Sequence, residues 1–566
     1  MSGHADVILA GGSVYTAGPD GARLGPAAGP GGRPATAVAI AGGRIAAVGD
    51  AGDAQFRDLT GPRTEVISLA GRAVLPGFQD AHVHPAFAGV TMAGCNLIGA
   101  ATLDEALARI SAYARAHPEK EWIAGGGWRM EWFENGTPGR QALDAVTGGR
   151  PAYLLNRDAH GAWVSTRALE LAGLDARTPD PRDGRIEREA GGGPQGTLHE
   201  GAANLVGALV PDPSLAEQVA GLLLAQQHLH ARGITGWQDA IVGSYLGSLD
   251  PLDAYLAAAE SGQLTARVRG ALWWDRSRGA EQLPGILARR ERGQAGRFRA
   301  GTVKIMQDGV AENHTAAMID PYLDPAGCHR DHGSGLSYVD PEALREYVTA
   351  LDAEQFQVHL HAIGDRAVRE SLDAIAAARA ANGPAGATAL RHHIAHLQVV
   401  HPDDVPRFAQ LGVTANMQAL WAAHEPQMDE LTIPFLGPER AARQYVFGDL
   451  AAAGARLACG SDWSVTSASP LRAIHVAVNR ALHGASGAEA EPFLPGQALD
   501  LAQALAAYTA GSAYVNHLDD ETGTITPGKL ADLIVLDRDP FAVPEHEIAS
   551  ITVQQTLVNG ETVFRA

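Results

Sequence analysis

Short apolar runs alternate with longer Ala- and Leu-rich runs along the middle of the chain. Eight of the short runs are expected to be strands: AVLPGFQDAH near residue 75, GITGWQDA near 235, RVRGALWW near 268, TVKIMQDG near 303, FQVHLHAIG near 358, RHHIAHLQ near 393, GVTANMQ near 413 and ARLACGSD near 457. From the second run onward they begin about 20 to 55 residues apart, which leaves room for one strand and one helix in each unit. Eight such units predict an α/β protein with a (β/α)8 barrel, whose chemistry lies at the carboxyl ends of the strands.

The two ends of the chain and one long gap do not fit this repeat. About 160 residues follow the first strand before the second, so we expect an insertion within residues 95–220 that shapes the pocket. Both ends carry short strand-like runs with glycine turns, such as AVAIAGGRIAAVGD and ITVQQTLVNG. We predict one sheet domain built from residues 1–74 and 515–566, with the barrel over residues 75–514. Two unrelated terminal appendages are the alternative.

The charge balance narrows the class of partner. The 566 residues include 44 Lys and Arg against 64 Asp and Glu, giving a net charge of −20. This argues against binding to nucleic acid or to an anionic membrane, because both need a basic face. Three cysteines are too few for a disulfide framework, no signal peptide is visible, and no apolar run approaches the roughly 20 residues of a membrane span. We expect a cytoplasmic protein that acts on a small molecule.

His82 and His84 close the first predicted strand. Residues two apart in a strand point to the same side, so both imidazoles can reach one metal ion. A chance surface pair is the alternative. Their place after LPGFQDA and before Pro85, at the end of a barrel strand, favours the metal site.

Lys304 lies within the fourth predicted strand, between Val303 and Ile305. A charged lysine is costly to bury in an apolar strand. An ion pair with Asp308 or another carboxylate is one interpretation. The other is a lysine that is neutral enough to react with CO2, which would turn it into an anionic oxygen ligand.

The fifth and sixth predicted strands each offer a histidine ligand. His361 is nearer the end of its strand than His359, so we choose His361 as the ligand and expect His359 to be a supporting or core residue. His396 is the choice on the sixth strand. By strand alternation His392 should share its face, and we expect His392 and His393 to be structural or supporting residues.

Asp462 follows LACGS at the end of the eighth predicted strand. A carboxylate there can act as general base and then as general acid, whereas the alternative is an N-cap of the next helix. Together the four histidines, Lys304 and Asp462 converge from strands 1, 4, 5, 6 and 8. Their nitrogen and oxygen atoms suit zinc, or another divalent metal such as Mn, Fe, Co or Ni.

The motifs that carry a family resemblance span nearly the whole chain: LPGFQDAHVHP (75–85), VKIMQDG (303–309), TAAMIDPY (315–322), HLHAIGDRAV (359–368), HHIAHLQ (392–398), GSDWSV (460–465) and GTITPGKLADLIVLD (523–537). In them the chain resembles the amidohydrolase superfamily, and specifically its YtcJ-like branch, which includes N-substituted formamide deformylases. The resemblance implies a distorted, metal-bearing (β/α)8 TIM barrel with a composite β-sandwich from both termini. Ala395 is a departure, because many relatives carry Glu before the sixth-strand histidine.

The resemblance also implies the chemistry. The expected metal-site residues are His82, His84, Lys304, His361, His396 and Asp462. They would hold one or two Zn2+ ions or other divalent transition metals, with a CO2-derived carbamate on Lys304 as a bridge between two of them. The expected reaction is hydrolysis of an amide-type, non-peptide C–N bond, as in an N-formyl or N-acyl amine, by metal-activated hydroxide with Asp462 as general base and acid. Cyclic-amide hydrolysis or aromatic-base deamination at the same site, and a catalytically inactive barrel scaffold, are alternatives. Barrels of this kind often pair, so a homodimer is also expected.

Substrate contacts are expected from the insertion and from the loop after the fourth strand. Trp128 and its aromatic neighbours would form a wall, and His160, in NRDAHGAW, would orient the substrate. His314 and Tyr322, in ENHTAAMIDPY, could reach the site from their loop. Aromatic packing inside the insertion is the alternative for Trp128. Asp308 and Glu312, which belong to the same region, are expected to be structural.

Overall fold

A parallel barrel lies at the centre of the computed structural model, which describes residues 3–245, 249–323, 333–383 and 389–566. Its strands follow one another in the order of the sequence: β8 (Phe78–Val83), β15 (Ile234–Val242), β16 (Arg267–Trp273), β18 (Phe298–Met306), β19 (Gln357–Ala362), β20 (His393–His396), β21 (Thr414–Met417) and β22 (Leu457–Cys459). These are the eight predicted strands, so the prediction of an α/β barrel is confirmed.

Helices cover the outside of these strands. Their apolar positions recur every three or four residues, as in α10 (Pro341–Ala353), which buries Leu344, Val348 and Leu351. The other helices of this layer are α2 (Pro85–Ala93), α7 (Leu215–His230), α8 (Leu252–Glu260), α9 (Leu283–Arg292), α11 (Asp365–Asn382), α13 (Val405–Leu411), α17 (Phe447–Ala452) and α18 (Pro470–Asn479). The elements α14 (Pro426–Leu431), α15 (Ile433–Leu436), α16 (Pro438–Ala441), α19 (Leu501–Ala506) and α20 (Ser512–Val515) are shorter.

The barrel meets itself at a seam between its first and last strands. There the N–H of Asp462 donates to the carbonyl of His82 (2.8 Å), and the N–H of His84 donates to the carbonyl of Trp463 (2.9 Å). Gly460 lies directly against β8, because a Cβ on it would stand 2.5 Å from the Cβ of His82. The seam therefore fixes the end of β8 next to the loop that follows β22.

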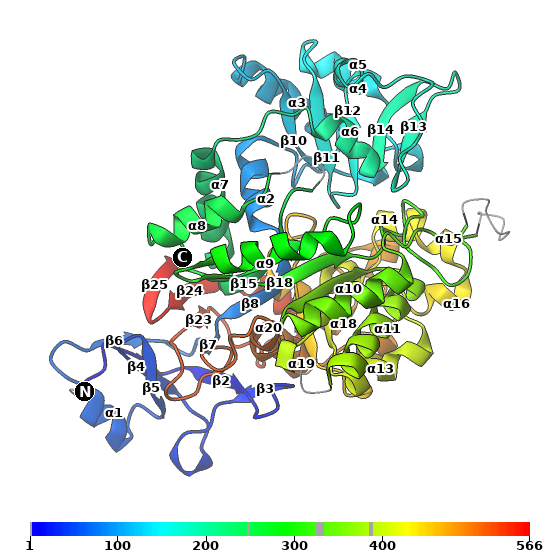
Figure 1. The fold of residues 1–566 in the computed structure, drawn as a ribbon. Coiled ribbons are helices and arrows are strands. Elements are labelled where there is room, and N and C mark those ends of the chain that lie inside the picture. Colours follow the sequence, from blue (N-terminus) through cyan, green and yellow to red (C-terminus); the bar gives the residue numbers. More distant parts are fainter. Residues whose placement is uncertain (1–2, 246–248, 324–332, 384–388) are drawn as a thin grey trace.

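The insertion is a layer of its own over one end of the barrel (Figure 1). Its sheet has the order β13 (Gly184–Arg188), β14 (Pro194–Glu200), β12 (Gly161–Val164), β11 (Ala152–Asn156), β10 (Ile123–Trp128) and β9 (Cys95–Asn96). Its helices are α3 (Leu103–Ala116), α4 (Arg140–Thr147), α5 (Thr166–Leu171) and α6 (Asn204–Gly207). The next helix, α7, packs on α2 in the barrel layer.

Both termini contribute to a pair of sheets beside the barrel. One sheet has the order β5 (Arg44–Gly49), β4 (Ala37–Ala41), β1 (Val7–Ala10) and β6 (Glu65–Ser68), with α1 (Ala54–Leu59) beside it. The other has the order β25 (Glu561–Arg565), β24 (Val553–Val558), β23 (Leu533–Leu536), β7 (Ala73–Pro76), β2 (Ser13–Ala17) and β3 (Leu24–Pro26). Strand β7 pairs antiparallel with β23, with Val74 opposite Val535. This pairing joins the N-terminal and C-terminal parts of the chain in one sheet. The passage into the barrel falls at Gly77, where a Cβ would lie 2.4 Å from a methyl of Thr235.

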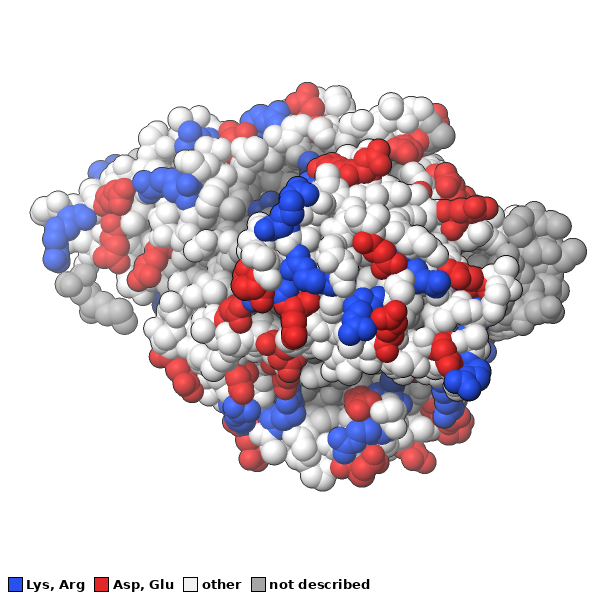
Figure 2. Space-filling view, turned by 90° about the horizontal axis from the view of Figure 1, so that it is seen from above, with Lys and Arg blue, Asp and Glu red and all other residues white. Residues whose placement is uncertain are grey.

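The surface carries both signs of charge. Acidic and basic side chains are interspersed over the face that bears the insertion (Figure 2), with no continuous basic patch in that view. In the ranges that the structure describes, no helix combines the length and the apolar character needed to cross a bilayer.

Candidate metal centre and active site

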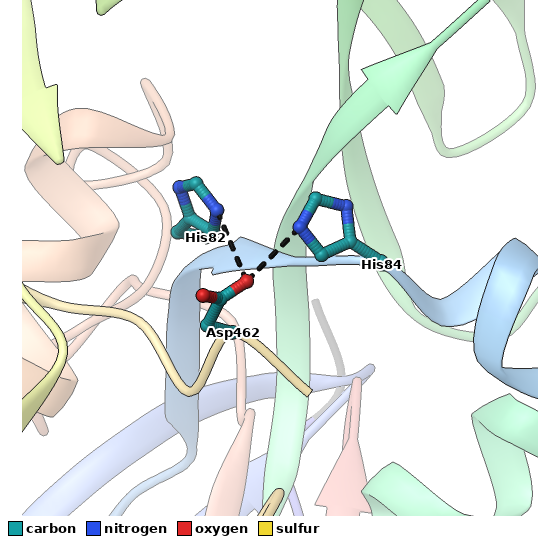
Figure 3. A group of neighbouring side chains, drawn as sticks. All are labelled: His82, His84 and Asp462. Carbon is teal, nitrogen blue, oxygen red and sulfur yellow. Dashed lines mark hydrogen bonds and ion pairs between the residues drawn. The ribbon is translucent and has the colours of Figure 1, made fainter. Parts of the chain in front are cut away.

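The end of β8 and the loop after β22 bring three predicted ligands together. The Nε2 atoms of His82 and His84 lie 3.3 Å and 3.0 Å from the Oδ1 of Asp462. Possible ligand atoms of all three residues lie within 4.8 Å of one another (Figure 3). The two histidines point to one side because they stand two apart at the strand end. Asp462, whose own backbone has a φ of 54°, reaches the two histidines from the seam between β8 and the loop after β22.

The other three predicted residues surround the same space. The ring of His396 lies 4.7 Å from that of His82 and 4.3 Å from that of His361, centroid to centroid. The Nζ of Lys304 and both ring nitrogens of His396 are buried and have no hydrogen-bond partner among the described residues. Buried polar atoms without partners are costly, so such a group of atoms is typical of a site that a ligand completes. The ion pair weighed for Lys304 with Asp308 is likewise not formed between these described residues.

The shifted pKa values in this pocket favour the deprotonated forms that bind a metal. Burial, with the nearby Lys304 charge, lowers the pKa of His82 to about 3, and burial lowers the pKa of Lys304 to about 7. Burial alone would raise the pKa of Asp462, but the neighbouring imidazoles of His82 and His84 hold it well below its usual range. His82 therefore presents a neutral imidazole beside the ionised carboxylate of Asp462, and these are ligand forms that a divalent metal requires. Its nitrogen and oxygen donors fit zinc or a similar transition metal.

His361 is held in one tautomer by the backbone. Its Nε2 lies 3.3 Å from the carbonyl oxygen of Gly309. A carbonyl only accepts, so Nε2 carries the proton and Nδ1 keeps its lone pair. Nearby Asp308 accepts the N–H groups of Ala317, Ile363 and Gly364, which confirms the expected structural role of that carboxylate.

The alternation expected on the sixth strand is wrong. His392 points out of the barrel, where its Nε2 bonds Asp352 at 2.9 Å. His393 points inward, with its ring 4.0 Å from that of His359. His396 also faces inward although it stands three residues after His393, because His396 and Leu397 adopt φ values of 79° and 54° that break the pleat.

His160 faces the same pocket from the insertion. Its Nδ1 lies 3.0 Å from Oε1 of Glu200, and its backbone N–H donates to Asn156 and Asp158. Burial lowers the pKa of His160, but the Glu200 charge and hydrogen bond outweigh it and raise the pKa to about 9. His160 lines the pocket, so its protonated ring can donate to a molecule bound there.

A cavity of about 640 Å³ connects these groups to the space beneath the insertion. It is lined by the six predicted metal-site residues and His160. Its aromatic wall consists of Phe87, Tyr113, Trp122, Tyr153, Tyr245, Trp273 and Trp421.

Three expected substrate contacts lie outside this wall and are corrected. Trp128 is buried in the core of the insertion, where its indole N–H donates to the carbonyl of Leu154. The hydroxyl of Tyr322 donates to the carbonyl of Ala316, and His314 packs against Tyr322 and Phe435. The packing partners of these side chains lie in the insertion core for Trp128 and in the segment around Phe435 for His314, away from the cavity lining.

Two carboxylates near the centre were missed by the sequence reasoning. Asp239, at the end of β15, lines the cavity and accepts the Tyr255 hydroxyl at 2.6 Å; burial raises its pKa to about 6. Asp80 accepts the N–H groups of His82 and Ser461, both at 3.0 Å, and so ties β8 to the seam. Both residues could have been found in the sequence, because each is an acidic residue within a short apolar run that was predicted to be a barrel strand.

Comparisons with known proteins agree with this geometry. The model of the amidohydrolase family matches residues 65–564. LONG AFTER FAR-RED 3 of Arabidopsis thaliana is 31% identical over 94% of this chain and 88% of its own length, and N-substituted formamide deformylase of Arthrobacter pascens is 28% identical over 93% and 94%. An uncharacterized metal-dependent hydrolase from Pyrococcus horikoshii superposes with a TM-score of 0.70 at 25% identity, over 95% of this chain and 99% of that one. The resemblance inferred from the motifs, including its YtcJ-like branch, is confirmed.

Proposed function

Because the chain belongs to the amidohydrolase family, whose members here include metal-dependent hydrolases, we propose that it hydrolyses an amide-type, non-peptide C–N bond, such as that of an N-formyl or N-acyl amine. The observation that carries the proposal is the convergence of His82, His84 and Asp462 at one point of the cavity. The fold alone does not specify the substrate.

The proposed metal-site residues are those that surround this point: His82, His84, Lys304, His361, His396 and Asp462. Zn2+ is the metal that these donors suit best, with one or two ions in the site. When bound, the metal supplies Lewis-acid activation of water and of the scissile carbonyl.

Asp462 is proposed to move the proton. Its carboxylate is ionised, buried and at the edge of the cavity, so it can accept a proton from the attacking water. It then delivers that proton to the departing nitrogen, because an amide anion is too poor a leaving group. His84, whose Nε2 lies 3.0 Å from Oδ1, holds the carboxylate in place for both steps.

Lys304 is proposed to carry a carbamate. Burial lowers its pKa to about 7, so a substantial fraction of the amine is neutral at neutral pH. The neutral amine adds to CO2, forming an N–C bond and releasing one proton. The product is an anion with two oxygens in place of an unpartnered Nζ.

The cavity wall supports an apolar substituent on the substrate nitrogen. Aromatic side chains line the part of the cavity beneath the insertion, and His160 offers its Nε2–H to the substrate carbonyl or acyl oxygen. N-aryl or N-alkyl formamides combine an apolar group with such an oxygen, so they are the first substrates to assay.

Metal content tests the proposal most directly. We expect the protein purified without chelator or metal-affinity resin to contain one or two equivalents of zinc, and to release amine from N-formyl substrates. Chelation should abolish turnover and lower the melting temperature, because a ligand bound only by the folded state stabilises it. Zinc should restore both. His392→Asn, outside the barrel, serves as the histidine control that keeps its metal.

Each other outcome is informative. Release of ammonia from heterocyclic substrates, with no amine from formamides, would replace the proposed reaction by deamination at the same site. A protein that takes up no metal even with zinc and bicarbonate would support the inactive scaffold and overturn the proposal.

The His160–Glu200 pair predicts a pH dependence of stability. The pKa of His160 in the folded state, about 9, lies above its ordinary 6.5. Its contribution is therefore fully present below pH 6.5 and lost as the pH rises through 9. In metal-free protein, we expect the advantage of wild type over His160→Gln to shrink by about 3 kcal/mol across this window, measured as the free energy of unfolding in urea.

Two variants control this measurement. Glu200→Gln should remove the same pH dependence, because it deletes the partner charge. His475→Gln should leave it intact, since burial lowers the pKa of His475 to about 4, outside the window. A pH-independent difference between wild type and His160→Gln would contradict a protonated His160.

A further inference from the structure

We propose that Gln238 is a positioning residue that fixes the ring tautomer of His82 through a chain of hydrogen bonds across the barrel. The chain consists of Gln357, Gln238, His359 and His82, and we call it the glutamine–histidine chain. All four side chains are buried. The inference rests on the proposed metal site in one respect: His82 is one of its proposed ligands.

The backbone sets the direction of the chain at one end. The Nε2 of Gln357 lies 2.9 Å and 2.8 Å from the carbonyl oxygens of Arg391 and Val515. Carbonyls only accept, so the amide nitrogen of Gln357 must face them. Its Oε1 then accepts from the Thr302 hydroxyl at 2.7 Å and from Nε2 of Gln238 at 3.1 Å.

This arrangement decides which atom of Gln238 faces the histidines. Its Oε1 lies 2.7 Å from Nδ1 of His359 and 3.1 Å from Nε2 of His393, so both rings must donate to it. With its proton on Nδ1, His359 offers a lone pair at Nε2, which lies 2.8 Å from Nδ1 of His82. His82 must therefore donate its Nδ1–H to Nε2 of His359, which leaves the Nε2 of His82 unprotonated.

A second set of contacts independently reaches the same assignment. The Nδ2 of Asn416 donates to the carbonyl of Ala81 at 2.9 Å and lies 3.1 Å from Nδ1 of His393. The Oδ1 of Asn416 accepts from Gln418, whose own Oε1 accepts the backbone N–H of His396 at 2.6 Å. His393 therefore accepts at Nδ1 and carries its proton on Nε2, as the chain requires.

The result is two acceptors that face each other. The bare Nε2 of His82 lies 3.3 Å from the carboxylate oxygen of Asp462, and a cation between them would satisfy both. Without Gln238, the chain can reverse: His359 donates from Nε2 to His82, and His82 turns its own Nε2–H toward Asp462. That reversed state gains a hydrogen bond but blocks the ligand atom, so a metal would have to displace it.

Gln238→Met tests the proposal because it removes the acceptor and keeps the volume of the side chain. We expect the dissociation constant for zinc, measured by competition with a chromophoric chelator, to rise about 10–100-fold. In metal-free protein labelled with 15N in the histidine rings, NMR should show protonated Nδ1 at His82 and His359 in wild type. In the variant these two rings should shift to protonated Nε2.

Gln79→Met is the matched control. Gln79 is equally buried and lies on β8, but it bonds Thr522 and Asn516 rather than a histidine. Its zinc affinity should equal that of wild type although its melting temperature falls. Unchanged zinc affinity in Gln238→Met, or equal weakening in both variants, would overturn the proposal.

If Gln238→Met does not fold, the histidine tautomers of metal-free wild-type protein, measured by the same NMR experiment, still decide the proposal. Protonated Nε2 at His82 or at His359 in metal-free wild type would overturn the chain. This result is separate from the proposed function, because a wild-type protein with the stated tautomers that binds no zinc would disprove the metal site alone.

Discussion

Asp462→Asn is expected to reduce kcat by about 10²–10⁴-fold, the range that a positioned proton-transfer group contributes. Asparagine keeps the shape of the side chain and its contacts with His82 and His84, but it cannot accept the proton of the attacking water. The measurement is kcat for an N-formyl amine, with the zinc content of the same sample determined beside it. Turnover should fall far more than metal content.

Asp352→Asn is the control for this effect. Asp352 is also a buried carboxylate bonded to a histidine, but it lies outside the barrel against His392. Its replacement should cost stability and leave kcat near that of wild type. Near-full turnover in Asp462→Asn would exclude the assigned proton transfer.

Lys304→Met is expected to lower kcat by at least about 100-fold and to reduce the zinc content from two equivalents to one. Methionine fills the same buried space but cannot form a carbamate, so the anionic oxygens that would hold the second ion are lost. Protein exchanged with 13C-bicarbonate should show a carbamate carbon by NMR in wild type and not in the variant.

Lys529→Met separates this effect from the general loss of a lysine. The Nζ of Lys529 donates to the carbonyls of Asp519 and Thr522, away from the cavity. This variant should keep its metal and its carbamate signal. Wild-type protein with one zinc and no such signal would assign Lys304 a structural or electrostatic role instead.

The apolar and polar pattern predicted the eight barrel strands and the insertion after the first of them. Each strand is a short local run with a helix behind it, and such runs are visible in the sequence because their burial repeats along the chain. The same pattern placed His82, His84, His361, His396 and Asp462 at strand ends and Lys304 within its strand. Parallel strands in a barrel bring their carboxyl ends to one rim, so local positions sufficed to expect that these residues meet.

The orientation of single side chains needed the tertiary structure. Strict alternation assigned His392 to the inner face, but the positive φ at His396 changes the pleat and leaves His393 inside. Trp128, His314 and Tyr322 are turned away from the cavity by packing partners in distant segments, such as Leu154 and Phe435. No local signal encodes those partners.

The sequence by itself determined the barrel, its insertion and the set of chemical groups at its rim, because these depend on periodicity and on residue type. Only the tertiary structure decided the His160–Glu200 pair, the cavity wall and the direction of the glutamine–histidine chain. These depend on contacts between residues more than 30 positions apart, such as Gln238 with His359 and Gln357 with Val515. Hydrogen bonds of this kind have direction, and the direction is set by which backbone carbonyls the folded chain places beside each amide.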